Sequence, residues 1–189
     1  MQKLSRAFIK LFQIILYIPI QIIFIPFAII GLIDAIYKEM VNSKKLGVSY
    51  SAIKALQYRW IMHYFNTRPD ALSVAFTKKF PCESHFGLWS TLGALIISQR
   101  LFGFTTRLGK LVEPGEETLD STAGIRVLMF DRIMEKYVDE MAQIAILGAG
   151  FDLIALHLTK GKKVKVFELD QVKTMDVKVE ILKKNRYKA

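Results

Sequence analysis

The chain has 189 residues, of which 52% are hydrophobic, and it carries a formal net charge of +10. This hydrophobic content excludes an intrinsically disordered chain, because such chains lack the apolar residues needed to build a core. A single cysteine, Cys82, excludes an internal disulfide and a cysteine-rich metal site. The three histidines have no ligand spacing, so we assign no metal site. No recognised nucleic-acid motif accompanies the positive charge, and we expect no nucleic-acid partner.

The first predicted element is a long apolar helix within residues 1–38. No charged side chain occurs from Leu11 to Ile33. A helix of this length spans roughly 34 Å, which is enough for a hydrocarbon core of about 30 Å. A soluble core helix seldom stays apolar on every face for so long, and a signal peptide has a shorter apolar stretch. The sequence therefore predicts a membrane anchor, transmembrane at about 11–33, with membrane lipid as its partner.

The way in which this anchor meets the membrane is left open by the sequence. Pro19 and Pro26 lie on nearly the same helical face, so we expect the helix to bend. A bend allows a monotopic insertion into one leaflet as well as a single-pass crossing. Basic residues flank both ends equally, which leaves the orientation undetermined by the positive-inside rule. These residues are Lys3, Arg6, Lys10, Lys38, Lys44 and Lys45.

Residues 39–119 are predicted to form a helical region. A helix is expected from Ser51 to about Asn66, with apolar residues along one face. The stretch from Phe86 to Gln99 is uncharged but too short to cross a bilayer. We expect it to be a core helix or an amphipathic helix on the bilayer surface.

Residues 120–189 are predicted to begin a parallel sheet. An apolar run, Gln143 to Leu147, ends in two glycines, Gly148 and Gly150, which is typical of a buried parallel strand followed by a tight turn. Helical spacing over 152–158 and 172–184 brackets a second strand over 163–169, and Asp170 follows that strand. Glycine lets backbone amides approach a ligand closely, and a carboxylate after the second strand can accept hydrogen bonds from ribose hydroxyls.

The identity of the nucleotide depends on the position three residues after Gly150. A dinucleotide fingerprint has glycine or alanine there, whereas this chain has Leu153. The pattern therefore disfavours NAD, although an NAD-type nucleotide-binding module stays as an alternative, whereas S-adenosylmethionine has no pyrophosphate and does not require a small residue there.

Two motifs in this part resemble the leucine carboxyl methyltransferase family of class I S-adenosylmethionine-dependent enzymes. The first is Leu-Gly-Ala-Gly-Phe-Asp, ending at Asp152, and the second is Phe-Glu-Leu-Asp, ending at Asp170. A third motif, Gly-Ile-Arg-Val around Arg126, matches an arginine on the helix before the family's first strand. The resemblance implies that Arg126 binds the methionine carboxylate, that Gly148 and Gly150 line the cofactor pocket, and that Asp170 binds the ribose.

The resemblance also implies a reaction and a fold. The reaction is methyl transfer from a sulfonium to an oxygen of a carboxylate or hydroxyl substrate, with S-adenosylmethionine as cofactor. A carboxylate with a pKa of about 4 needs no general base, and we assign no catalytic residue. The expected fold class is α/β: the start of a Rossmann-like class I methyltransferase sheet with two parallel strands, after a helical region and a transmembrane helix. The methyltransferase part is expected in the cytoplasm.

Two departures from the family lower the expected activity. Leu153 and Ile154 stand where the family commonly has threonine and arginine. The two predicted strands are fewer than a class I sheet contains, so we expect a truncated and inactive protein. A non-enzymatic membrane-anchored remnant, or a partner-binding protein, is the alternative. Because two strands cannot cover both faces of their sheet, we also expect exposed apolar surface around Ile144, Ile146, Val164 and Val166.

Overall fold

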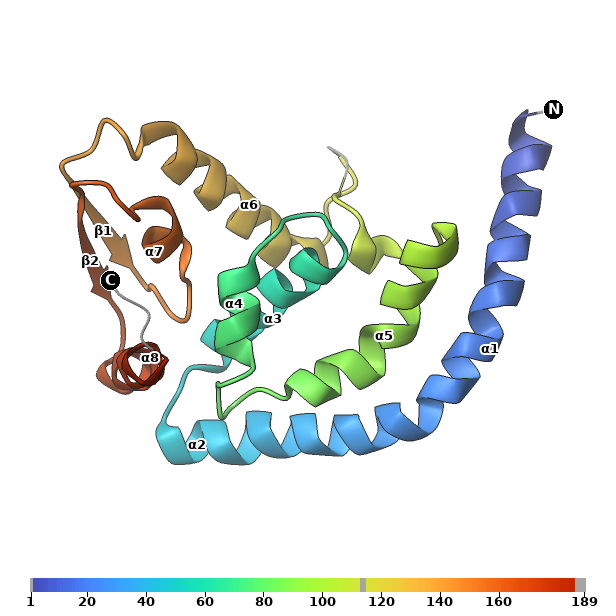
Figure 1. Cartoon of the computed structure of the whole chain (residues 1–189), viewed down its shortest axis with the longest axis horizontal. Helices are drawn as coiled ribbons and strands as arrows, with labels where there is room; N and C mark the ends of the chain where they lie inside the picture. Colours follow the sequence, from blue (N-terminus) through green and yellow to red (C-terminus); the bar gives the residue numbers. More distant parts are fainter. Residues whose placement is uncertain (1, 113–114, 186–189) are drawn as a thin grey trace.

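The computed structural model describes residues 2–112 and 115–185 (Figure 1). A long N-terminal helix lies along one margin, other helices fill the middle, and a two-stranded sheet lies at the opposite margin. The mixed α/β architecture, with two parallel strands after a helical region, agrees with the prediction. In chain order the elements are α1 (Gln2–Tyr37), the π-helix η1 (Lys38–Asn42), α2 (Ser43–Leu46), α3 (Tyr50–Tyr64), α4 (Ala71–Thr77), α5 (His85–Phe102), the 3-10 helix η2 (Arg107–Gly109), α6 (Leu119–Tyr137), β1 (Gln143–Leu147), α7 (Ile154–Leu158), β2 (Lys165–Leu169) and α8 (Val172–Lys184).

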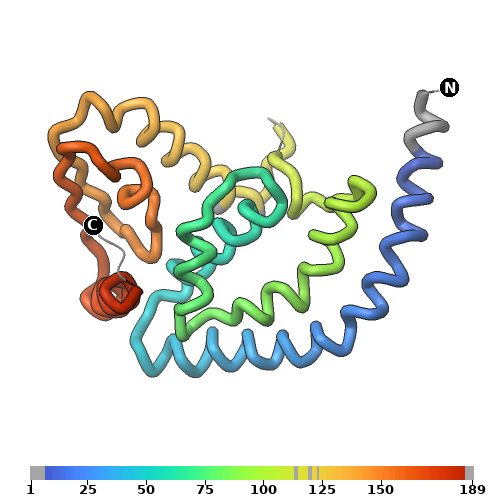
Figure 2. The backbone as a smooth tube through the Cα atoms, in the orientation of Figure 1, coloured from blue at the N-terminus to red at the C-terminus, as the bar shows by residue number. Residues whose placement is uncertain are grey.

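The predicted N-terminal apolar helix is present as α1, which continues directly into η1 and α2. By length and composition this helix could cross a membrane. It contains Pro19 and Pro26, and Figure 2 shows that its path bends partway along. α2 ends at Gly47, whose φ of 65° is left-handed, as is common at a helix C-terminus.

Small residues form the seam between α1 and α5, which lie against each other in antiparallel directions. A Cβ atom at Gly87 of α5 would be 2.6 Å from the backbone oxygen of Gly31 of α1. Further along the seam, Gly93 of α5 lies against the ring of Phe24. Close approach of this kind needs residues without bulky side chains. The sequence of α5 is therefore fitted to α1 in particular.

Substitution of Gly87 by alanine is expected to destabilise the protein by about 1–3 kcal/mol, because the added methyl group meets a backbone atom that cannot move cheaply. Gly124 of α6 is a matched control, since a Cβ there would meet only the flexible end of Met62, at 3.1 Å. Gly124→Ala should stabilise the protein by up to about 1 kcal/mol through helix propensity. Thermal unfolding of both variants in the same detergent micelles measures the difference. Stability changes of the same sign in the Gly87→Ala and Gly124→Ala variants would contradict a tight seam between α1 and α5.

The other side of α5 packs on α3 and α4. Trp60 of α3 is fully buried, and its Nε1 donates a hydrogen bond of 3.0 Å to Nδ1 of His85 at the start of α5. The Trp60 and Trp89 rings meet edge to face, with centroids 5.9 Å apart. The apolar residues of this layer are Trp60, Ile61, Tyr64, Phe65, Val74, Leu88, Trp89, Leu92, Leu95 and Ile96. The run from Phe86 to Gln99 is therefore a core helix between α1 and α3, one of its two predicted placements.

The strands β1 and β2 pair in parallel, with Ile144 opposite Val166. The expected exposure of Ile144 is wrong: this side chain is buried, and the other three named with it are half-buried. α8 approaches the sheet on this face, which also carries Glu168. Lys178 of α8 is fully buried and pairs with Glu168 of β2 at 2.7 Å.

The opposite face of the sheet is the exposed one. Leu147 is 79% exposed, and Phe167 and Leu169 are each 51% exposed. Among the described residues, no helix covers these side chains. The apolar surface expected from a two-stranded sheet therefore exists, but it lies on the other face from the one predicted.

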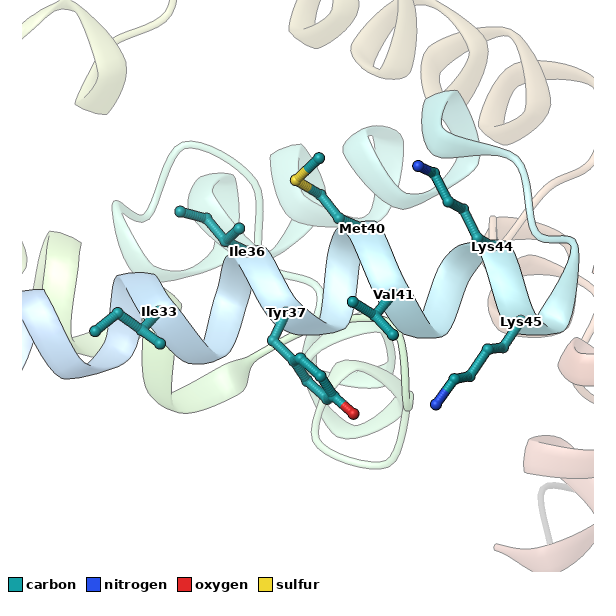
Figure 3. Close-up of a pocket in the computed structure, with 7 residues that line it drawn as sticks. All are labelled: Ile33, Ile36, Tyr37, Met40, Val41, Lys44 and Lys45. Carbon is teal, nitrogen blue, oxygen red and sulfur yellow. The ribbon is translucent and has the colours of Figure 1, made fainter.

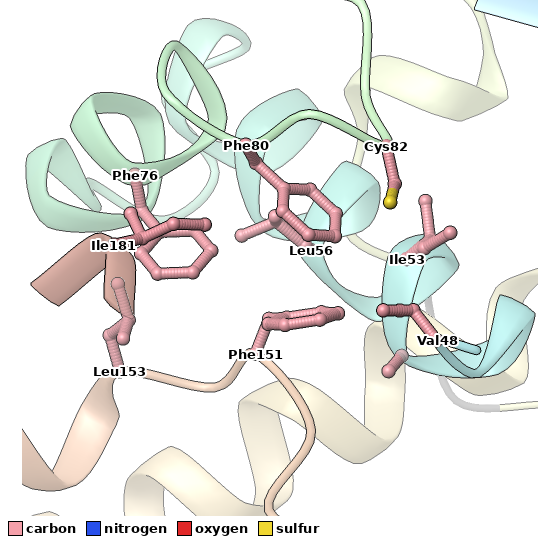
Figure 4. Close-up of a cluster of buried hydrophobic side chains, with 10 residues drawn as sticks. Val48, Ile53, Leu56, Phe76, Phe80, Cys82, Phe151, Leu153 and Ile181 are labelled. Atoms are coloured by element: carbon pink, nitrogen blue, oxygen red, sulfur yellow. The ribbon is translucent and has the colours of Figure 1, made fainter. Parts of the chain in front are cut away.

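One hydrophobic cluster joins the sheet to the helical region (Figure 4). Phe151, from the turn after β1, packs against Phe80 and Phe76, with ring centroids 4.3 and 5.8 Å apart. The buried members are Val48, Ala52, Ile53, Leu56, Phe76, Phe80, Cys82, Phe151, Leu153 and Ile181. The turn that follows β1 is thus seated on α3 and α4 and is part of the core.

Candidate functional site

The glycine turn after β1 is built on left-handed backbone positions. Gly148 has a φ of 71° and Gly150 a φ of 49°, values that side chains with a Cβ rarely adopt. The N–H groups of Gly148 and Ala149 donate to the carbonyl oxygen of Leu169, at 2.8 and 3.2 Å. The turn is therefore tied to the end of β2, which brings the two predicted motifs together.

Asp170 lies beside this turn at the end of β2. Its Oδ2 accepts a hydrogen bond of 2.7 Å from the N–H of Gly150, and its Oδ1 accepts one of 2.7 Å from the N–H of Gln171. Glu168, the other acidic residue of the motif, pairs instead with Lys178. Each Asp170 oxygen keeps further acceptor capacity, so this carboxylate can still bind a ligand hydroxyl.

The two glycines have different surroundings. A Cβ atom at Gly148 would meet nothing within 4 Å, whereas one at Gly150 would lie 3.2 Å from Cβ of Ala52 in α3. Gly150 is buried, and its N–H is already bonded to Asp170. The open side of the turn, on which a ligand can approach the backbone, is therefore at Gly148.

Arg126 lies on α6, and its side chain is exposed. Within residues 2–112 and 115–185, no hydrogen bond or ion pair links Arg126 to the glycine turn or to Asp170. The structure thus brings Gly148, Gly150 and Asp170 together directly and leaves Arg126 apart from these contacts.

A buried ion cluster behind the turn was not predicted from the sequence. Arg59 of α3 is 1% exposed and pairs with Asp152 after the turn, with Asp131 of α6 and with Asp70, the last two at 3.3 Å. Arg68 pairs with Asp70 at 2.5 Å and also with Asp131. The cluster therefore connects α3, the start of α4, α6 and the glycine turn.

The charges in this cluster compensate one another. Burial opposes the charge of Arg59, but its carboxylate neighbours outweigh burial and hold the pKa of Arg59 above its ordinary value. Burial raises the pKa of Asp131 in spite of the two arginines beside it. Arg59 is thus the central cation of the cluster, and its loss would leave the three carboxylates with Arg68, which pairs with Asp70 and Asp131, as the remaining cation.

The backbone of the turn is held by a second cation. Nζ of Lys178 donates a hydrogen bond of 2.5 Å to the carbonyl oxygen of Asp152, and the Asp152 side chain accepts one of 2.8 Å from the N–H of Ile154. A sequence signal for Arg59 does exist: it lies three residues after Leu56, on the apolar face of α3, where a charged residue needs a buried partner.

Comparison with known proteins finds a family to which part of this chain is similar. The family model described as leucine carboxyl methyltransferase matches residues 98–189, which include α6, the glycine turn and Asp170. The search of curated proteins and the search of solved structures each returned no match. The match extends on both sides of the motifs on which the resemblance was based, Thr122 to about Asp176.

Proposed function

Because residues 98–189 match the family model of leucine carboxyl methyltransferases, we propose that this chain is a membrane-associated S-adenosylmethionine-dependent methyltransferase-like protein. The family is S-adenosylmethionine-dependent in general. When bound, this cofactor supplies an electrophilic methyl group on a sulfonium. The part of this chain is to bind and orient it with the glycine turn and Asp170.

The observation that carries the proposal is the junction of the glycine turn with Asp170. The hydrogen bond from Gly150 to Asp170 fixes a carboxylate at the carboxyl end of β2, next to the open side of Gly148. Ligands of open parallel sheets bind at this edge. Asp170 would accept hydrogen bonds from the two ribose hydroxyls, and the Gly148 backbone would contact the rest of the cofactor.

Arg126 is proposed as the partner of the methionine carboxylate. Its guanidinium is exposed on α6, within the stretch that matches the family. A planar guanidinium suits a carboxylate because it can donate two parallel hydrogen bonds. The methyl acceptor is proposed to be a carboxylate or hydroxyl oxygen. A carboxylate acceptor is already ionised at neutral pH and requires no base.

Membrane association is proposed from the surface of α1. Side chains such as Phe8, Ile23 and Ile33 are 73%, 65% and 65% exposed on this helix. Soluble monomers rarely expose a continuous apolar surface of this extent. Lipid is therefore the proposed partner of α1.

Binding of S-adenosylmethionine to the full chain in micelles tests the cofactor site. We expect a dissociation constant of about 1 mM or weaker, because the space next to Gly148 is open and offers a ligand few protein contacts: a Cβ atom there would meet nothing within 4 Å. Asp170→Asn should weaken binding by about tenfold or more, since it removes the charge of a charge-assisted contact and keeps an oxygen for the Gly150 N–H. Ligand-observed NMR can measure this range.

Asp176→Asn provides a matched control, because Asp176 is exposed on α8 and follows the site by six residues. This variant should bind as the unchanged protein does. Equal binding by the Asp170→Asn variant and the unchanged protein would exclude Asp170 from the site. If Arg126→Gln leaves the binding of S-adenosylmethionine unchanged, Arg126 is likewise excluded from the proposed site.

A further inference from the structure

The packing of α1 on the rest of the chain limits how it can meet a bilayer. At one end, Nε2 of Gln13 donates a hydrogen bond of 2.8 Å to the carbonyl oxygen of Phe102. At the other end, the Ser84 hydroxyl pairs with the carboxylate of Asp34. The uncharged stretch of α1 is therefore held against α5 along its full length, and not only at its end.

A spanning α1 would draw charged groups into the hydrocarbon. α5 is packed on α3 through Trp60 and Trp89, so α3 would lie at the same depth as α1. α3 carries Arg59 and Lys54, and Lys54 pairs with Glu39 of η1 at 3.0 Å. Charged side chains are strongly disfavoured at bilayer depth. The rest of the chain after α1, which we call the body, therefore opposes a membrane crossing that α1 alone could make.

The uncovered side of α1 has the features of a lipid-facing surface. In Figures 1 and 2, α1 bends along the outer margin and the rest of the chain lies on its inner side. Two rows of apolar side chains run from the end of α1 into η1 and lead to Lys44 and Lys45 of α2 (Figure 3). The rows consist of Ile33, Tyr37 and Val41, and of Ile36 and Met40. Apolar residues that give way to lysine mark the passage from hydrocarbon to headgroups.

The opposite end of the apolar stretch has a lysine as well. Lys10 is exposed one residue before Leu11. Within the part of the chain that the structure describes, none of Lys10, Lys44 and Lys45 forms an ion pair. Lysines without an ion pair at both ends of one apolar surface can each contact the same layer of headgroups.

From this arrangement we infer that α1 lies within a single leaflet, with both of its ends at the membrane surface on which the body lies, and that Lys10, Lys44 and Lys45 contact anionic phospholipid headgroups. This inference rests on the proposed membrane association and specifies its geometry. The body then stays in water with its glycine turn, and the methyl acceptors within reach are those at that same membrane surface.

The topology can be tested by cell-free synthesis of the full chain beside preformed phosphatidylcholine–phosphatidylglycerol vesicles. Ala7→Cys and Leu46→Cys introduce a thiol near either end of the apolar surface, and a membrane-impermeant maleimide is added outside. Both variants should be labelled without detergent. The unchanged chain is the blank, because its one cysteine, Cys82, is buried. Labelling of one of the two sites only after detergent is added would show a spanning helix and overturn the inference.

Flotation of the same vesicles distinguishes a membrane-spanning α1 from a failure of the proposed membrane association. If the chain does not float together with the vesicles, it does not associate with membranes, and the proposed membrane association fails. The Lys10→Gln, Lys44→Gln and Lys45→Gln triple variant should lose about a hundredfold in binding to phosphatidylglycerol-containing vesicles, at about 1 kcal/mol for each lysine. A control variant with the same three lysine-to-glutamine changes at Lys110, Lys160 and Lys163 should lose much less binding to these vesicles. Equal losses in the two triple variants would overturn the headgroup contacts.

Discussion

Arg59→Met is expected to lower the free energy of unfolding by about 3–5 kcal/mol at neutral pH. The substitution keeps much of the side-chain volume but leaves Asp70, Asp131 and Asp152 with Arg68 as the remaining cation of the cluster. Because carboxylates that have lost a cationic partner take up protons more readily, the loss should shrink as the pH falls towards about 4. Urea unfolding in micelles at two pH values measures both effects.

Arg132→Met is the control for this substitution, since Arg132 is exposed on α6. It should change the free energy of unfolding by less than about 0.5 kcal/mol. A loss in the Arg59→Met variant that did not depend on pH would point to packing as its cause. No loss at all would mean that the cluster contributes nothing net to stability.

Glu83→Gln is expected to stabilise the protein at alkaline pH. Glu83 is 2% exposed, and burial raises its pKa from 4.5 to about 7. The folded state therefore holds a proton that the unfolded state releases between about pH 4.5 and 7. The contribution of Glu83 to stability is fully present below pH 4.5 and decreases as the pH rises through 7, by up to about 3 kcal/mol. Glutamine is neutral throughout and lacks this decrease.

The comparison of the variant with the unchanged protein at pH 5 and pH 8.5 isolates Glu83 from other titrating groups. The two proteins should be similarly stable at pH 5, because glutamine can still accept the hydrogen bond of 2.8 Å from the Ser84 N–H. At pH 8.5 the variant should be the more stable. A variant that is less stable at both values would show that Glu83 is ionised and paired in the folded protein.

Local features of the sequence predicted the sheet and its turn well. The strand expected over 143–147 is β1, and the helix expected over 172–184 is α8. The second strand begins at Lys165, two residues after its predicted start. These elements follow from the period of apolar residues and from the glycines that end strands, both of which are short-range signals.

Long-range contacts could not be predicted in the same way. The sequence gives no indication that Arg59 meets Asp152, because the pairing depends on how α3 packs on the turn. The seam of α5 was likewise missed, although Gly87 and Gly93 were visible as small residues in an apolar run. The face of the sheet that is covered was also predicted wrongly, since it depends on α8 and Lys178.

The distance along the chain between Arg59 and Asp152 has a consequence for the order of folding. These two residues are 93 positions apart, and their pairing closes a large loop. Such contacts form late, because the entropy of loop closure must be overcome before they stabilise anything. During synthesis, α3 emerges well before β1 and can fold first. The N-terminal helices would then act as the template on which the glycine turn folds. A destabilising substitution in α3 would first appear as slow folding of the turn.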